Sequence, residues 1–445
     1  MIAKERFRLL IPIGLFHTMA HIYPYLLPIL CLVIREDILM NYTQIAILSM
    51  TGILVTIPLT IVFGFLGDKI SKWRLELIIA GFVLVFGHTY IIYVAQTYAI
   101  LIIAAVIGGI GSSVFHPIAL PLLSLEFGKD RNLAHSVNLI FGTLGSIITP
   151  IASISLSSWL GWRITSLIFG IAGTALFPIL LIFTLLGKKY LQYIPEGHVA
   201  IGEQVISVTK NSKRGFNGQL KNKLSFITVP LIAVILAQII RSGTFRVVNT
   251  FTVFIFEDKF GASEIGAALI MSIILGMGGI AALISGFVSS KYGSLKTFLY
   301  SKGATTIASV FVILFVGFIA LSHTTVNIYL LILAIFLFIL LTTSFYFGSP
   351  SANGLFAEMV PGRVLSSTFG IVNSLMTGFS ALTPVIFGAI VDQNYSLPYE
   401  YLLLVIFSLI PFLLLLYTKI KTEKENSFKT IDDKKISGEN NESEK

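Results

Sequence analysis

Charged residues are scarce in this chain of 445 residues: Asp, Glu, Lys and Arg make up 12% of it, whereas 55% is hydrophobic. Soluble domains contain about a quarter charged residues. Long windows hold no charge at all, among them 77–86, 100–121 and 136–162. A helix needs about 20 mostly apolar residues to cross a bilayer core of about 30 Å. The composition therefore excludes a soluble globular domain and predicts a multi-pass membrane protein.

Cysteine is almost absent as well: Cys31 is the one cysteine, so no internal disulfide can form. The short alternating strands of a transmembrane barrel are missing too, which leaves helices as the spanning elements. The sequence has no GxxxxGK(S/T) nucleotide loop, no nucleophile–base pair and no cluster with metal-ligand spacing. We therefore expect no enzymatic activity, no cofactor and no bound metal.

Long apolar runs are what the chain has in abundance, and twelve can be counted. They lie near 9–34, 43–66, 75–96, 98–125, 133–157, 162–187, 226–256, 264–289, 297–321, 325–348, 366–391 and 399–419. The first run is too long for the core of a cleaved signal peptide and lacks a small-residue cleavage site, so we expect it to be retained. Twelve such runs predict an all-α membrane protein with twelve transmembrane helices.

Lysine and arginine gather on one side of this arrangement. With twelve spans, both termini share a side with the loops that hold Lys69, Lys129, Lys291 and the basic stretch 188–225. Basic loops mark the cytoplasmic face. We therefore predict a protein of the plasma membrane with both termini in the cytoplasm. The same asymmetry accounts for the net charge of +9, so no nucleic-acid partner is expected.

The two halves of the chain repeat each other. GFLGDKISKWR at 64–74 realigns with GFVSSKYGSLK at 286–296, and FHP at 115–117 is echoed by GSP at 348–350. Such repeats are typical of transporters whose binding site lies where the halves face each other. We predict two pseudo-symmetric six-helix bundles, a cytoplasmic loop between them and a disordered polar tail. The boundaries are 1–187, 188–225, 226–419 and 420–445.

The loop after the second span resembles the signature of the major facilitator superfamily, G-x-L-x-D-R/K-x-G-R/K-R/K. The matching residues are Gly64, Leu66, Asp68, Lys69, Lys72 and Arg74. Ser71 replaces the second glycine and Trp73 takes a basic position. The resemblance implies a cytoplasmic gate, in which glycines allow close helix contact and Asp68 caps a helix end or pairs with a base. In the second half Ser290 stands at the acid position, so that copy cannot form the same ion pair.

Spans 1, 4 and 5 resemble more narrowly the fosmidomycin-resistance-like efflux group. His17, Tyr23 and Pro28 match its first-span motif H-x-x-N-D-x-Y-x-x-x-x-P, and His21 takes the place of the Asp. In span 4, GGIGSSVFHP matches through Gly109, Gly111, Phe115, His116 and Pro117. In span 5, an antiporter-like helix-packing run is represented by Gly142, Gly145 and Pro150, with Thr149 in place of a glycine. The resemblance implies proton-coupled efflux, although Ala104 and Ala105 stand where many proton-driven exporters carry an arginine.

Polar groups inside the spans are few, and no Asp or Glu lies mid-membrane. Helical spacing puts one set on a single face of the first span: Gly14, His17, His21, Pro24 and Pro28. Titratable and kink-forming residues suit a cavity wall, but two histidines bonded to backbone carbonyls would serve packing alone. In span 4, Ser112 lies one turn before His116. The candidate substrate and proton sites are therefore His17, His21, Tyr23, Ser112 and His116.

A metal is the alternative reading of His17 and His21, because two histidines four residues apart can share one. A closed site needs about four ligands, and an intramembrane metalloprotease needs Glu beside the first histidine. Thr18 stands there instead, and no cysteine or acid is near in the sequence. The sequence therefore favours a proton site over a metal site.

Two arginines interrupt the seventh span. A central Arg costs about 2.5–3.5 kcal/mol on insertion scales unless water, a partner or an anion compensates it. Arg246 follows Arg241 by five residues, which turns it by about 140° around the helix. Both therefore cannot face one cavity. We predict that Arg241 contacts an anionic substrate and that Arg246 reaches outward.

Together these features predict a monomeric secondary transporter that exports a small organic anion or an amphiphilic toxic compound by alternating access. Protons are the expected coupling ion, because imidazole changes its protonation state near neutral pH. An importing symporter for an organic acid or sugar is the nearest alternative. A non-transporting sensor or assembly protein with a transporter-like body is the second.

Overall fold

The computed structural model describes residues 7–188, 226–258, 260–322, 327–391 and 402–436, and all the regular elements in this part of the chain are helical. The first half holds α1 (Phe7–Asp37), α2 (Tyr42–Lys69), α3 (Arg74–Val94), α4 (Tyr98–Ser112), α5 (Phe115–Phe127) and α6 (Arg131–Lys188). The second half holds α8 (Val229–Asp258), α9 (Glu264–Tyr292), α10 (Ser294–Ser322), α11 (Ile328–Phe347), α12 (Ser349–Met359), α13 (Leu365–Val391) and α14 (Leu402–Ile436).

Among these described residues, ten helical runs are long and apolar enough to cross a membrane. The longest, Tyr98–Leu186, has 89 residues and holds α4, α5 and all but the end of α6. Helix α6 turns at Gly161, whose φ of 75° is open to glycine but strained for other residues, so α6 has two arms. That run therefore contains three crossings, and the prediction of an all-α protein with twelve spans is confirmed.

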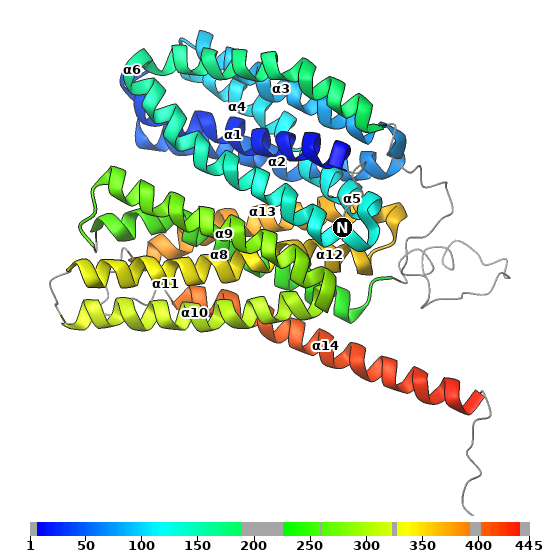
Figure 1. The fold of residues 1–445 in the computed structure, drawn as a ribbon. Helices are drawn as coiled ribbons and strands as arrows, with labels where there is room; N and C mark the ends of the chain where they lie inside the picture. The colour runs from blue at the N-terminus through cyan, green and yellow to red at the C-terminus, as the bar shows by residue number, and fades with distance from the viewer. Residues whose placement is uncertain (1–6, 189–225, 259, 323–326, 392–401, 437–445) are drawn as a thin grey trace, which may run out of the picture.

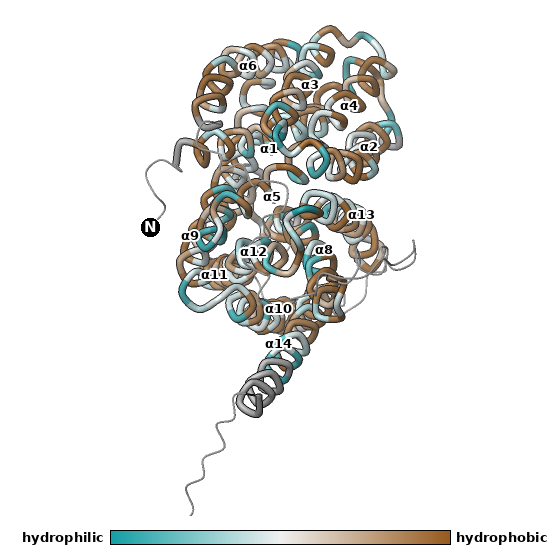
Figure 2. The backbone as a smooth tube through the Cα atoms, turned by 90° about the vertical axis from the view of Figure 1, so that its right-hand side faces the viewer, coloured by the Kyte–Doolittle hydropathy of each residue, from teal (hydrophilic) through white to brown (hydrophobic). Residues whose placement is uncertain are grey.

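The helices form two groups that lie side by side, α1–α6 and α8–α14 (Figures 1 and 2). Each group has its own apolar core, one around Phe16, Phe86 and Phe115 and the other around Phe256 and Phe338. A further apolar cluster joins α5 of the first group to α8, α12 and α13 of the second. The halves of the chain are thus separate bundles that touch along a shared interface.

The helices extend beyond the prediction at two places. The tail predicted to be disordered from 420 continues α14 as a helix to Ile436. Its Lys and Glu residues are good helix formers, and Lys419 and Glu423 form an i,i+4 pair at 3.9 Å. Span 10 does not end at 348 either, because α12 follows α11 to Met359. Residues 437–445 and nearly all of the loop 188–225 lie outside the described residues, and the domain boundaries stay a prediction.

Candidate functional site

A cavity of about 220 Å³ lies between the two halves. Its walls come from α1, α2, α3, α4 and α5 on one side and from α8 and α13 on the other. The polar and charged side chains that line it are His21, Tyr25, Ser49, Thr56, His88, Ser112, His116, Arg246, Thr377 and Ser380. No carboxylate is among these lining residues. An arginine and imidazoles in a pocket without acids favour an anionic ligand.

A break in the fourth span brings His116 to this cavity. Helix α4 ends at Ser112, and α5 starts at Phe115 after a turn at residues 113–114. Pro117 explains the break, because it has no N–H to continue the ladder and its ring clashes with the carbonyl four residues earlier. The second half has an equivalent break: α11 ends before Gly348, and Pro350 lies in the first turn of α12. His116 and Ser349 therefore both lie at the start of a half-helix near the centre of the fold.

Three histidines meet beside the cavity. The ring centroid of His17 lies 4.9 Å from that of His21 and 5.3 Å from that of His116. The rings of His21 and His116 are 6.3 Å apart. One ring nitrogen from each histidine lies within 4.8 Å of the other two. The sequence pairs His17 with His21, but the third member comes from α5, about a hundred residues later.

Helix α6 holds two of these rings in place. His17 Nδ1 lies 2.6 Å from the carbonyl oxygen of Asn138, and His21 Nδ1 lies 2.8 Å from Oγ of Ser146. A Cβ on Gly142 would lie 2.6 Å from the His17 ring. The helix-packing run predicted in span 5 thus lies directly against the histidine face of α1.

Other residues of this glycine-containing run of α6 also contact α1. Thr149 Oγ1 bonds the carbonyl of Gly145 at 2.6 Å and approaches that of His21 at 3.4 Å. A Cβ on Gly145 would overlap the backbone carbonyl of Thr18. Gly142, Gly145 and Thr149 therefore pack directly against α1, and Pro150 follows them in the same run of α6.

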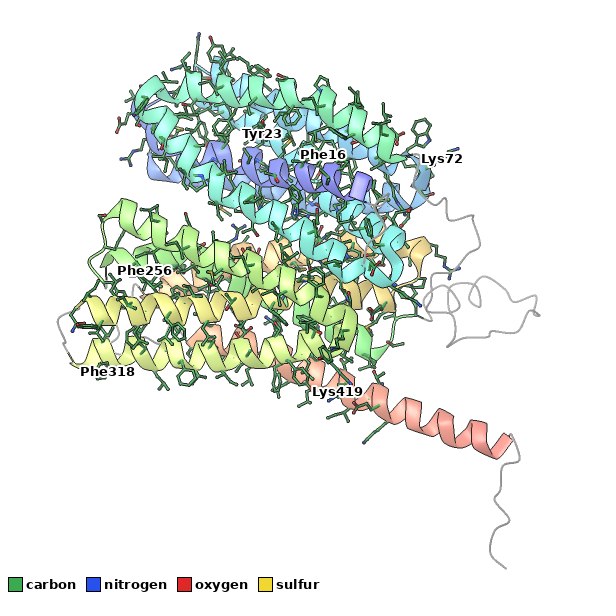
Figure 3. The ribbon with its side chains drawn as sticks, in the orientation of Figure 1. Phe16, Tyr23, Lys72, Phe256, Phe318 and Lys419 are labelled. Carbon is green, nitrogen blue, oxygen red and sulfur yellow. The ribbon has the colours of Figure 1, made fainter. Side chains whose placement is uncertain are left out.

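Not every predicted candidate faces the cavity. His21, Ser112 and His116 line it, together with Pro24 and Pro28 from the predicted stripe. His17 does not: it is 4% exposed and lies behind the other two histidines. Tyr23 is also buried, inside the first bundle (Figure 3), where its hydroxyl donates to the carbonyl of Phe169 at 3.0 Å. Tyr23 therefore does not line this cavity, because its side chain points to the opposite side of α1, and its role as a substrate residue stays a prediction.

The two arginines of α8 face different surroundings, and their positions relative to the cavity are the reverse of those predicted. Arg246 lines the cavity opposite His21 and His116. Arg241 is buried in the second bundle, where Nη1 donates to Oγ of Ser349 at 2.7 Å. The angle between the arginines follows from the sequence, but the absolute rotation of α8 depends on packing.

Lys302 is a functional candidate that the sequence inventory omits. It is 1% exposed, and its Nζ lies 4.5 Å from the ring centroid of Phe345, which Arg241 also approaches at 4.8 Å. Among the described residues no carboxylate pairs with either cation. A lone lysine in the apolar run 297–321 is the sequence signal that could have found it.

Lys302→Met is expected to raise the free energy of unfolding by about 1–4 kcal/mol, because Met fills a similar volume without a buried unpaired ammonium. The midpoint of thermal unfolding of the purified protein measures this. The matched control is Lys296→Met on the exposed face of the same helix, which should change stability by less than about 0.5 kcal/mol. A destabilised Lys302→Met protein would mean that the charge is compensated in the folded state.

The loop motif joins the two bundles at one end of the cavity. The carboxylate of Asp68, at the end of α2, accepts from the backbone N–H groups of Ser366 (2.9 Å) and Ser367 (2.7 Å) in the first turn of α13. It also accepts from the Ser367 hydroxyl at 2.5 Å and pairs with Arg74 at 3.6 Å. Asp68 therefore does both things expected of it: it caps a helix and pairs with a base.

Gly64 makes this contact possible, since a Cβ there would lie 2.6 Å from the carbonyl oxygen of Ser366. Lys69 and Lys72 are both exposed, which suits topology anchors, and their part in the gate stays a prediction; Figure 3 labels Lys72. In the second copy Ser290 only bonds the carbonyl of Gly286 in its own helix, at 2.9 Å. Asn132 instead links α6 to Ser294 of α10 at 2.9 Å. The two copies of the motif therefore close the interface differently.

Comparisons with known proteins agree with this architecture. The family model of the Major Facilitator Superfamily matches residues 13–349 and 234–437. The fosmidomycin resistance protein of Escherichia coli (strain K12) is 25% identical over 150 residues, which covers 34% of this chain and 36% of that protein. An uncharacterized MFS-type transporter, YfnC, of Bacillus subtilis (strain 168) is 21% identical over 86% of both chains.

Solved structures share the fold at low identity. The transporter FucP, crystallised in the outward conformation, has a TM-score of 0.69 and 13% identity over 93% of this chain and 99% of its own. A bacterial homologue of the iron transporter ferroportin, in an outward-facing state, has a TM-score of 0.68 and 13% identity over 94% and 99%. At such identities the likeness concerns the fold alone.

Proposed function

Because this chain belongs to the major facilitator superfamily, we propose that it is a proton-coupled exporter of small organic anions or amphiphilic toxic compounds. The chain is a multi-pass membrane protein and a secondary transporter. The proposal adds the coupling ion, the charge of the substrate and the direction of transport. It is carried by one observation: the cavity between the bundles presents His21 and His116 on one wall and Arg246 on the other, with no carboxylate in its lining.

The arrangement supports a coupling between proton binding and anion binding in the cavity. An imidazole can gain or lose a proton within the physiological pH range, whereas a guanidinium stays charged. Arg246 attracts the anion in every state of the cycle, and the charge on the histidines decides how strongly the cavity holds it. The charged and titratable groups around His21 are His17, His88, His116, Tyr25 and Arg246. His21 and His116 are the coupling residues of this proposal.

The closed end of the cavity supports alternating access. Asp68 fastens α2 to α13, and Ser374 Oγ donates to the carbonyl of Ile57 at 2.6 Å within the same pair of helices. The basic loops predict that this end is cytoplasmic, with both chain termini on that side. In this orientation the described conformation is closed to the cytoplasm, and rocking of one bundle against the other would open it.

Proton coupling is tested with His21→Gln protein reconstituted in vesicles. Wild-type flux should depend on pH and on an imposed pH gradient, and His21→Gln should weaken that dependence because glutamine does not titrate and His116 alone remains to couple the proton. Fosmidomycin is the first probe, since a partial relative is named for resistance to it. The matched control is His135→Gln, a buried histidine that bonds Ser124 at 2.8 Å outside the cavity lining, and it should keep the pH dependence.

Unchanged pH dependence in His21→Gln would refute the coupling role. Reversing the pH gradient separates export from the importing symporter, because an antiporter and a symporter move substrate in opposite directions under the same gradient. Absence of flux for every anion tested would favour the non-transporting alternative.

A further inference from the structure

We propose that His17, His21 and His116 form a binding site for a transition-metal dication of the Zn²⁺ class. The three histidines are the group of potential ligands that the described residues bring together, with one ring nitrogen of each within 4.8 Å of the others. Metal binding itself does not depend on the proposed transport function. The sequence shows two of these ligands and argues against a metal, and the third ligand enters only through the break between α4 and α5.

The hydrogen bonds of the cluster leave a free lone pair on His17. The carbonyl oxygen of Asn138 can only accept, so Nδ1 of His17 carries the proton and Nε2 keeps its lone pair. Histidines that bind metals usually donate their other ring N–H to a carbonyl or carboxylate, which fixes the tautomer and the ring orientation. His17 already has this arrangement without a metal.

His21 has an equivalent arrangement through a hydroxyl. Ser146 lies 2.8 Å from Nδ1 of His21 and can give its own proton to the carbonyl of Gly142 at 3.3 Å. Nδ1–H of His21 then donates to Oγ, and Nε2 is left as the ligand atom. His116 forms no hydrogen bond within the described residues, so its ring can rotate toward a bound ion.

The distances require a small closure around the ion. Nitrogens at about 2.0–2.1 Å from a tetrahedral ion are about 3.4 Å apart, compared with the separations of up to 4.8 Å in this structure. The three rings must therefore move toward one another, and His116, which has no hydrogen bond within the described residues, is the freest of them to move. Because His21 and His116 line the cavity, the fourth position of the ion faces open space and is free for water or an anion.

The donor set selects the class of ion. Ca²⁺ and Mg²⁺ require oxygen ligands, and the lining of this cavity has no carboxylate. Neutral imidazoles suit Zn²⁺, Cu²⁺, Ni²⁺ and Co²⁺. Arg246 in the same cavity opposes a net positive charge, so we expect an anion as the fourth ligand. A metal needs the lone pair that a proton would occupy, so metal and proton exclude each other at this site.

The test uses the full-length chain without a histidine tag, purified in detergent and titrated with Co²⁺. One equivalent should bind and give the intense visible absorption of tetrahedral Co²⁺, and Zn²⁺ should displace it. His17→Gln, His21→Gln and His116→Gln should each weaken binding at least about tenfold. The matched control is His88→Gln, because His88 lines the same cavity but lies outside the cluster, and it should bind as the wild type does.

Several results would overturn the proposal: no stoichiometric binding by the wild type, an unchanged affinity in His116→Gln, or an equal loss in His88→Gln. X-ray absorption of the Zn²⁺-loaded wild type avoids the risk that a variant misfolds. It should report imidazole ligands, and a first shell with sulfur or with oxygen alone would refute the site. Inhibition of flux by Zn²⁺ that weakens at low pH is a consequence that rests on the proposed function. Binding without flux would refute only the transport proposal, and flux without binding would refute only the metal site.

Discussion

Asp68→Asn is expected to reduce substrate flux in vesicles to the background level. The Asp68 carboxylate accepts three hydrogen bonds from the first turn of α13 and pairs with Arg74, so it joins two bundles through one side chain. Asparagine keeps one acceptor oxygen and turns an NH₂ group toward N–H donors. Removing one partner of a buried charge pair costs about 3–5 kcal/mol. At 1.4 kcal/mol per factor of ten, the closed state should lose more than about a hundredfold in population.

Two measurements separate this effect from misfolding. A cysteine introduced near α13 at the closed end should react faster with a thiol reagent in Asp68→Asn than in the wild type. The midpoint of thermal unfolding of the purified protein should change little, which shows that the variant is folded. Ser290→Ala is the matched control, because Ser290 holds the same place in the second repeat but bonds only its own helix. It should transport as the wild type does. Full flux in Asp68→Asn would show that the α2–α13 contact has no role in the cycle.

Arg246→Gln is expected to weaken binding of an anionic substrate by about tenfold to a hundredfold. A hydrogen bond to a charged group contributes about 1.5–3 kcal/mol, and Arg246 is the arginine that lines the cavity. Ligand-induced stabilisation of the purified protein measures the change, with a panel of phosphonates and carboxylates as probes. A neutral amphiphile should bind Arg246→Gln as tightly as the wild type, because the loss is electrostatic.

Arg241→Gln is the matched control for this prediction. Arg241 donates to Ser349 inside the second bundle and does not line the cavity. The Arg241→Gln substitution should alter the stability of the protein without a bound anion. The affinity for anions should stay within about twofold of the wild-type value in this conformation. The opposite result, with affinity lost in Arg241→Gln and kept in Arg246→Gln, would restore the assignment made from sequence and contradict the one made from geometry.

The membrane architecture follows almost entirely from the sequence. Twelve apolar runs, their repeat and the gate motif of Asp68 are local patterns, and a bilayer forces any such run into a helix that satisfies its own backbone. The breaks near Pro117 and Pro350 are local as well. Span prediction passes over the first because both of its pieces are apolar, and it stops at the second, which leaves α12 out of the tenth span. The helical end of α14 shows the opposite error, since polar composition alone does not exclude a helix.

What the sequence determined by itself is which residues lie in the membrane and which helices carry polar groups. The tertiary structure decided which way those groups face. Arg246 lines the cavity, whereas Arg241 lies inside the second bundle. Tyr23 is buried inside the first bundle. His116 lies beside His17 and His21. The physical reason is that helical periodicity fixes only relative angles along one helix. The absolute rotation of each helix depends on side-chain packing with neighbours that are distant in the chain.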